Sequence, residues 1–87
     1  MQPHTKVYMR HFKFGETDFI PCEICTSRAR DIHHINGRGK GKNVIENLIA
    51  LCRRHHEDCH NEVINKEQAQ TIHNITLRTN GNNTSKT

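Results

Sequence analysis

Large apolar side chains are scarce in this sequence. It contains no tryptophan, one tyrosine and three phenylalanines, and hydrophobic residues occupy only 32% of its 87 positions. A chain of this length forms one small domain, and this inventory gives that domain a thin core. Domains of this size commonly depend on disulfides or on a structural metal. The sequence therefore favours a cross-linked or metal-bound fold.

Long apolar runs are also absent. The first residues, MQPHTKVYMRHFKF, contain neither an uninterrupted apolar stretch nor a small-residue cleavage site, so we expect no signal peptide. No run of about 18 apolar residues is present, so we expect no membrane-spanning segment and no membrane partner. The expected location is the reducing cytoplasm, where the four cysteines favour metal binding over disulfides.

Basic residues outnumber acidic ones. The chain has 13 lysines and arginines against 9 aspartates and glutamates, which gives a formal charge of +4 and a pI near 9.1. This balance fits a polyanionic partner such as nucleic acid. It fits equally well a small soluble domain with a mildly basic surface, so charge by itself does not separate the two.

The order of apolar, glycine and proline positions predicts a small α+β fold. Residues 1–20 form a basic N-terminal segment, in which 7–14 alternate loosely, as a strand or an extended arm does. Residues 28–35 predict a short strand that ends at an Asn-Gly turn pair. The stretch NGRGKGKN (36–43) carries three glycines and three cations and predicts a loop.

Helices are predicted in the second half of the chain. The apolar segment 44–51 fits either a strand or the approach to a helix, because periodicity does not separate the two in so short a run. Residues 53–64 predict one helix and residues 66–77 a second. Asn65 is a suitable N-cap for the second helix, and Gln68 lies three positions later, in the register of a capping box.

The cysteines are spaced as parts of two metal-binding turns. Cys22 and Cys25 form a Cys-x2-Cys pair, and Cys52 and His55 form a Cys-x2-His pair. Three sulfurs and one imidazole nitrogen favour a structural zinc, which takes four protein ligands in a closed tetrahedral site. Cys59 can replace His55, because it lies on nearly the same helix face as Cys52. The more compact Cys-x2-His arrangement favours His55.

A second group of histidines lies close to these turns. His56 and His60 are four positions apart, the spacing at which two side chains share a helix face and can chelate one ion. For an isolated pair, simple solvation is the more common outcome. Here a zinc site would fix the start of the same helix against the segment that follows the first cysteine pair. That segment carries Asp31, His33 and His34, so we expect the two groups to meet.

The adjacent histidines are predicted to have different roles. Successive side chains on a strand point to opposite faces, so Asp31 shares a face with His33 and not with His34. We predict that His33 joins His56 and His60 as a metal ligand. Asp31 is placed to orient His33 or to bind the metal itself. His34 faces away and is left free for proton transfer.

These motifs resemble the HNH endonuclease family in order and spacing. The similar segments are CEIC (22–25), DIHHI (31–35), ENLIALC (46–52) and HHEDCH (55–60). Small phage and prophage members with an N-terminal Cys-x2-Cys pair are especially similar. The departure is His55, at a position where that branch usually has cysteine.

The resemblance implies a ββα-metal core, also called a His-Me finger, at residues 21–64. The zinc turns would cross-link this core. Segment 1–20 would precede it as an arm or strand, and a C-terminal helix (65–78) and a disordered tail (79–87) would follow it. If the chain is phage-encoded, its place of action is the host cytoplasm, and other phage or host proteins are further possible partners.

The family's residue roles fall on six positions of this chain. His34 matches the general base, Asn47 the asparagine that holds the base-bearing loop, Asp31 the acidic residue before the pair, and His33, His56 and His60 the metal ligands. The implied reaction is one-metal hydrolysis of a DNA phosphodiester to 5′-phosphate and 3′-hydroxyl ends. Mg2+ is the expected cellular ion, although three imidazoles suit Mn2+, Co2+ or Ni2+ better.

Five cations are candidates for contacts with DNA phosphates. Arg38, Lys40 and Lys42 lie on the glycine-rich loop, and Arg53 and Arg54 open the metal-binding helix. A solvated run of charge would have the same sequence pattern. No helix is rich in base-reading side chains, so we expect little sequence specificity.

Two other functions compete with a DNA endonuclease. A catalytically silent zinc module that binds DNA or protein needs the zinc ligands but not the second histidine group, so that group favours the nuclease. A nuclease that acts on RNA would use the same residues. Neither the oligomeric state nor a biological role, such as packaging, homing, restriction or toxicity, follows from the sequence.

Overall fold

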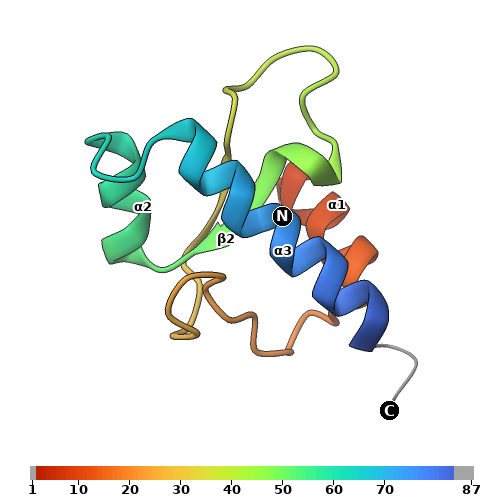
Figure 1. The fold of residues 1–87 in the computed structure, drawn as a ribbon. Helices are drawn as coiled ribbons and strands as arrows, with labels where there is room; N and C mark the ends of the chain where they lie inside the picture. The colour runs from red at the N-terminus through yellow and green to blue at the C-terminus, as the bar shows by residue number, and fades with distance from the viewer. Residues whose placement is uncertain (1, 84–87) are drawn as a thin grey trace.

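Two short antiparallel strands form the centre of the fold. The computed structural model describes residues 2–83, with side chains as far as residue 79. Its elements follow in the order α1 (Pro3–Phe12), β1 (Asp31–His34), the 3-10 turn η1 (Ile45–Asn47), β2 (Leu48–Leu51), α2 (Arg53–His60) and α3 (Lys66–Asn83) (Figure 1). The predicted small α+β fold is confirmed, because three helices surround a two-stranded sheet.

The register of the two strands sets the direction of the histidines. Asp31 pairs with Leu51 at one end of the sheet, and His34 pairs with Leu48 at the other. All four residues of β2 are buried, whereas in β1 only the second and fourth residues are buried. The predicted strand at 28–35 is thus shortened to four residues.

The N-terminal prediction is wrong. Most of segment 7–14, expected to be an arm or strand, belongs to helix α1. Pro3 stands in the first turn, where its missing N–H removes no helical hydrogen bond. His4, Tyr8 and Met9 are buried, and His4 and Tyr8, four positions apart, lie on the same helix face. The loosely alternating residues therefore pack with a helical repeat against the sheet.

The predicted helices of the second half are present with different ends. Helix α2 stops at His60, four residues short of the predicted end. The N–H of Asn65 donates to Gln68 Oε1 at 2.9 Å and the N–H of Gln68 donates to Asn65 Oδ1 at 2.8 Å, so the capping box of α3 is confirmed. Helix α3 runs to Asn83, so the expected disordered tail (79–87) is helical at its start, and its last four positions lie outside the described residues. No helix within residues 2–83 is long and apolar enough to cross a membrane.

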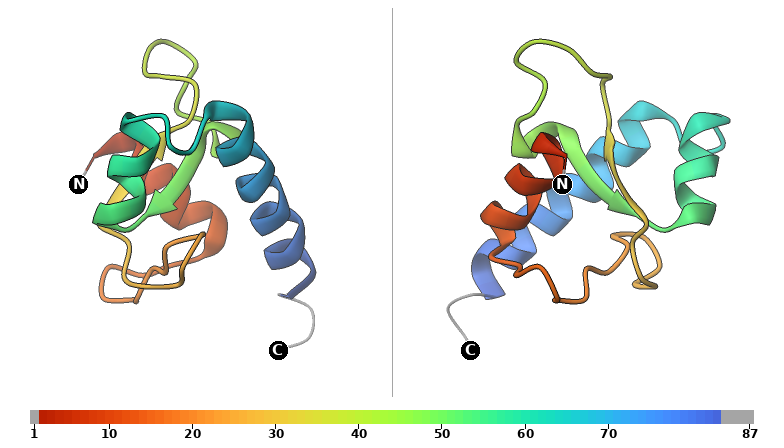
Figure 2. Two further views of the ribbon diagram at one scale, coloured as in Figure 1. Left: turned by 60° about the vertical axis from the view of Figure 1, so that its left-hand side comes forward. Right: turned by 180° about the vertical axis from the view of Figure 1, so that it is seen from behind.

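Helices cover both faces of the strand pair. On one face α1 packs through Tyr8 against Leu48, and on the other face α3 packs through Ala69 against Ile49. Seen from behind, α1 lies in front of the strands and α3 lies beyond them (Figure 2). Because alternate residues of β1 face these two sides, neighbouring histidines of that strand meet different helices. The glycine-rich loop after β1 projects from this body (Figures 1 and 2).

A buried acid connects the first cysteine turn to the rest of the fold. The side chain of Glu23 is 2% exposed. Its carboxylate accepts the Tyr8 hydroxyl at 2.6 Å and the Ala50 N–H at 3.2 Å, and it lies 2.9 Å from Nδ1 of His73. The other ring nitrogen of His73 donates to the Ile45 carbonyl at 2.6 Å. Burial and then the Glu23 carboxylate raise the pKa of the Tyr8 phenol, so Tyr8 remains a hydrogen-bond donor in this network.

Candidate metal centres beside a histidine cavity

The four predicted zinc ligands lie together at the start of α2. The ligand atoms of Cys22, Cys25, Cys52 and His55 all lie within 4.8 Å of one another. The sulfurs of Cys25 and Cys52 are 3.7 Å apart, and His55 Nδ1 lies 3.3 Å from the Cys52 sulfur. A zinc tetrahedron with bonds of about 2.3 Å to sulfur and about 2.0 Å to nitrogen has edges of about 3.8 and 3.5 Å. The donor set and its spacing fit a structural metal such as zinc.

Local backbone geometry places these ligands. The Cys22 carbonyl accepts the Thr26 N–H at 2.9 Å, and Thr26 closes the tight turn with a positive φ of 66°. The Ile24 N–H points to the Cys22 sulfur at 3.4 Å, a contact that stabilises a thiolate. Cys52 is the N-cap of α2, so His55 follows in the first turn of that helix. Both halves of the cluster are thus short, rigid segments.

The thiols differ in their environment. Hydrogen bonding to Ser27 lowers the pKa of the exposed Cys25 thiol to about 6, which favours the thiolate form that binds metal. Burial raises the pKa of Cys22 and that of Cys59. Cys59 packs partly buried against the core, outside the four-ligand group. The geometry therefore places His55, rather than Cys59, with the three cysteines.

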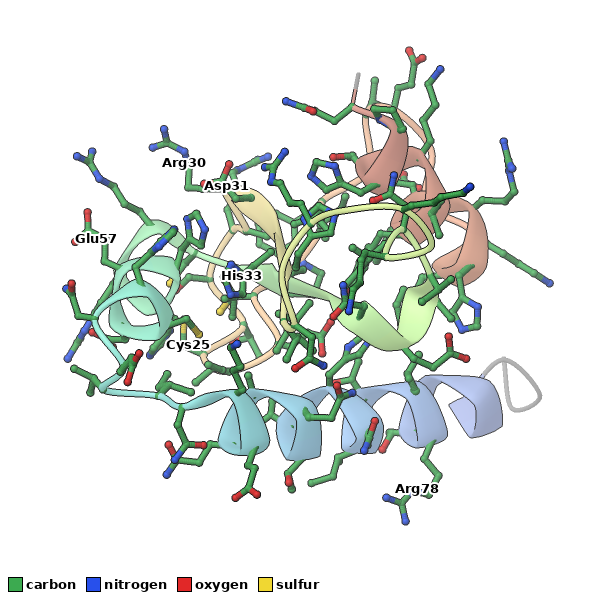
Figure 3. The ribbon with its side chains drawn as sticks, turned by 90° about the horizontal axis from the view of Figure 1, so that it is seen from above. Cys25, Arg30, Asp31, His33, Glu57 and Arg78 are labelled. Carbon is green, nitrogen blue, oxygen red and sulfur yellow. The ribbon has the colours of Figure 1, made fainter. Side chains whose placement is uncertain are left out.

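A second group of potential ligands contains only histidines. His56 and His60 lie one turn apart on α2, and His33 reaches them from β1; their ligand atoms all lie within 4.8 Å of one another. The ring centroids are 4.7, 5.1 and 5.7 Å apart. Figure 3 shows His33 between the strand and α2. Three imidazole nitrogens at this spacing suit a divalent transition-metal ion.

His33 is the least easily protonated member of this group. Burial, followed by the neighbouring His56 and His60, lowers the pKa of His33 to about 4. At neutral pH its ring is therefore uncharged and keeps a lone pair. A neutral imidazole is the form that ligates metal.

Asp31 contacts a different histidine from the one predicted. Its Oδ2 lies 3.3 Å from Nδ1 of His56, and Asp31 is not a member of the three-histidine group. The expectation that Asp31 orients His33 is thus corrected. Two positions along a strand span about 7 Å, and Asp31 stands at the end of β1 that faces the first turns of α2. The contact leaves Nε2 of His56 available for a metal.

His34 faces away from His33, as strand alternation predicted. It is buried against α1, with its ring centroid 4.4 Å from that of His4, and its Nε2 lies 2.8 Å from Asn43 Oδ1. Both adjacent histidines nevertheless line one cavity of about 610 Å³, together with His4, Asp31, Arg38, His56 and His60. The cavity therefore receives side chains from both faces of the sheet.

Asn47 ties down the loop that follows His34. This residue is 6% exposed. Its Oδ1 accepts the Asn36 N–H at 2.7 Å, and its Nδ2 donates to the carbonyls of Gly37 at 3.2 Å and Lys42 at 2.9 Å. One side chain at the end of η1, directly before β2, thereby holds both ends of the loop. This is the kind of contact that the resemblance implies for Asn47.

The predicted phosphate-binding cations fall into two groups. Arg38 lines the histidine cavity, whereas the two loop lysines and both arginines at the start of α2 are exposed outside it. Arg53 lies 3.5 Å from Glu57 on the outer surface of α2. Arg30, which was not predicted, also lines the cavity and lies beside Asp31 (Figure 3).

Sequence reasoning missed three residues of this region: His4 and Arg30, which line the cavity, and Asn43, which contacts His34. His4 belongs to a segment that was not recognised as a helix, and its repeat with Tyr8 was the available signal. Asn43 follows a glycine-rich loop whose path cannot be read from its composition. Arg30 directly precedes Asp31 and carries no motif of its own.

Comparison of the chain with protein-family models, with curated proteins and with solved structures finds no match. The structure is a small α+β fold with a Cys3His cluster able to hold a metal such as zinc, an arrangement compatible with a zinc-stapled ββα fold.

Proposed function

We propose that this protein is a metal-dependent endonuclease of the HNH type that hydrolyses DNA phosphodiester bonds. One observation carries the proposal: three histidines with ligand spacing and a fourth, differently held histidine border the same cavity. His33, His56 and His60 would hold the divalent ion, and His34 would act as the general base. A structural zinc domain has no need of this second set.

The surroundings of His34 suit a general base. Nδ1 of His34 has no hydrogen-bond partner among the described residues, and every buried side-chain nitrogen or oxygen of those residues has one. We infer that Nδ1 is the nitrogen that His34 presents to the cavity it lines. A neutral imidazole with an open nitrogen can take the proton of an attacking water near neutral pH.

The remaining cavity residues support binding of a phosphate. Arg30 and Arg38 would offset its negative charge and hold it by charge-assisted hydrogen bonds. Lys40 and Lys42 continue this positive surface along the loop that Asn47 anchors. Because these cations contact phosphates and not bases, the proposed activity has little sequence specificity.

The two metal centres would have separate tasks. When bound at the histidines, a divalent ion such as Mg2+ or Mn2+ would supply positive charge to the scissile phosphate and to the leaving oxygen. Asp31 would keep His56 in place through Nδ1. The Cys3His cluster would be structural, since it fixes the start of α2, and with it His56 and His60, against β1.

A plasmid-nicking assay tests this proposal. Zinc-loaded wild type should convert supercoiled plasmid to open circles in Mn2+ or Mg2+ and not in EDTA. His34→Ala should lower the rate by about 100-fold or more, whereas His11→Ala, an exposed histidine of α1, should not. Absence of metal-dependent nicking by the wild type would favour a silent zinc module, and cleavage confined to RNA would correct the substrate.

A further inference from the structure

The ring of His34 is contacted by two residues that belong to neither metal centre. Asn43 approaches from the end of the glycine-rich loop, with its Oδ1 at 2.8 Å from Nε2. His4 approaches from the first turn of α1, with ring centroids 4.4 Å apart and planes inclined by 52°. Asn43 lies within the ββα core, between β1 and β2, whereas His4 precedes that core in the sequence, and neither segment carries a predicted metal ligand.

The contact with Asn43 selects one tautomer of the neutral ring. An amide oxygen can only accept a hydrogen bond, so Nε2 of His34 must carry the hydrogen. The lone pair then remains on Nδ1, which has no hydrogen-bond partner among the described residues and belongs to a ring that lines the cavity. In the other tautomer the lone pair of Nε2 would face the Asn43 oxygen, so two acceptors would repel each other, and Nδ1 would carry the hydrogen.

The contact with His4 limits rotation of the same ring. His4 is 6% exposed and hydrogen-bonds the backbone of Ile32, so it is itself held against the strand. Burial and then His34 lower the pKa of His4, so the His4 ring is neutral at neutral pH. Removing it would take away the ring that packs against His34 at a centroid distance of 4.4 Å.

We propose that Asn43 and His4 are positioning residues that together fix His34 as the Nε2–H tautomer with Nδ1 facing the cavity. The catalytic meaning of this arrangement rests on the proposed nuclease function. The arrangement itself does not, because the tautomer can be measured without any substrate. Helix α1, outside the ββα core, thereby becomes part of the site.

Histidine ring nitrogens in NMR spectra test the tautomer directly. In zinc-loaded protein with 15N-labelled histidine, at mildly alkaline pH, His34 should show an unprotonated Nδ1 and a protonated Nε2. Asn43→Leu should populate the Nδ1–H form, whereas Asn43→Asp, which keeps an acceptor, and Asn36→Ala, an exposed residue of the same loop, should not. A protonated Nδ1 in the wild type, or an unchanged spectrum in Asn43→Leu, would overturn the role of Asn43.

Two substitutions of His4 test its ring contact with His34. His4→Phe keeps a ring and should keep both the wild-type spectrum and the nicking kcat. His4→Ala should give mixed tautomers and lower kcat by roughly tenfold or more with little change in KM. A wild-type spectrum in His4→Ala would contradict the role of His4. So would an equal loss of kcat in His4→Phe and His4→Ala. If the wild type does not nick DNA, the nuclease proposal fails while the spectra still decide the positioning proposal.

Discussion

His73 of the last helix lies 2.9 Å from the carboxylate of Glu23, fifty positions earlier in the chain. The two side chains are 0% and 2% exposed. Glu23 lies between Cys22 and Cys25, so the turn that carries half of the Cys3His cluster also docks α3. A fold with few apolar residues thus uses one buried acid to connect a metal-binding turn, the sheet and two helices.

The first prediction concerns this network. Glu23→Ala should lower the free energy of unfolding by about 3 kcal/mol or more, because it leaves His73 and the Tyr8 hydroxyl buried without their acceptor. Denaturant unfolding of zinc-loaded protein measures the loss. Glu57→Ala removes an exposed acid with one surface ion pair and should cost about 0.5 kcal/mol or less. Equal effects of the two substitutions would show that the network contributes nothing.

A second prediction separates the two metal centres. Metal analysis should find about one tightly bound zinc per chain in wild type, in Cys59→Ser and in the double variant His33→Ala/His60→Ala. His55→Ala should lose most of this zinc together with native circular dichroism, since structural zinc binding is coupled to folding. Zinc loss in Cys59→Ser with retention in His55→Ala would reverse the assignment of the fourth ligand.

The third prediction is a pH dependence. The pKa of His33 is about 4 in the folded protein against an ordinary value of 6.5. Between these values the unfolded chain binds a proton that the folded chain does not, so this group lowers stability as the pH falls from 6.5 to about 4. Above this window it has no effect, and below it the loss is constant.

Unfolding free energies of wild type and His33→Gln, measured across that pH window, show whether His33 lowers stability as the pH falls. The wild-type curve should fall more steeply towards acid, because the variant lacks the titrating group while acid effects on the cysteine cluster are common to both. Parallel curves would mean that His33 is as easily protonated in the fold as in the unfolded chain.

A fourth prediction concerns Asp31. Asp31→Asn keeps the shape of the side chain but weakens the contact with His56 Nδ1. Mn2+ affinity at the histidine group should fall by about 10- to 100-fold, as expected for loss of a carboxylate that orients a histidine ligand. Isothermal titration of zinc-loaded protein with Mn2+ gives the affinity. Glu57→Gln, on α2 next to His56, should bind Mn2+ as wild type does. If Asp31→Asn bound Mn2+ with wild-type affinity, Asp31 would have no part in the metal centre.

Local sequence patterns correctly predicted the features whose geometry depends on residues close together in the sequence. Strand alternation separated His33 from His34, and a side-chain exchange within one turn identified Asn65 and Gln68 as the capping box. The ligand groups followed from spacing within short turns and one helix face. Each of these local relations spans a few residues, so the sequence contains it directly, whereas the two halves of the Cys3His cluster come from turns 27 positions apart at Cys25 and Cys52.

The errors arose where packing between distant segments decides the outcome. Alternation in 7–14 suggested a strand, but burial of Tyr8 against the sheet selects a helical repeat. Asp31 was expected to contact His33, but the approach of α2 to the end of β1 brings His56 closer. The partners of Glu23 lie in elements whose mutual placement no local pattern encodes.

The most direct test of the central claim is the Mn2+ dependence of plasmid nicking by zinc-loaded wild type and zinc-loaded His56→Ala. His56 belongs to the histidine group and not to the Cys3His cluster. We predict saturable nicking by the wild type and a loss of about 100-fold or more in the variant, with its zinc content and unfolding curve unchanged. Nicking by His56→Ala at the wild-type rate and the same Mn2+ concentration would contradict the account.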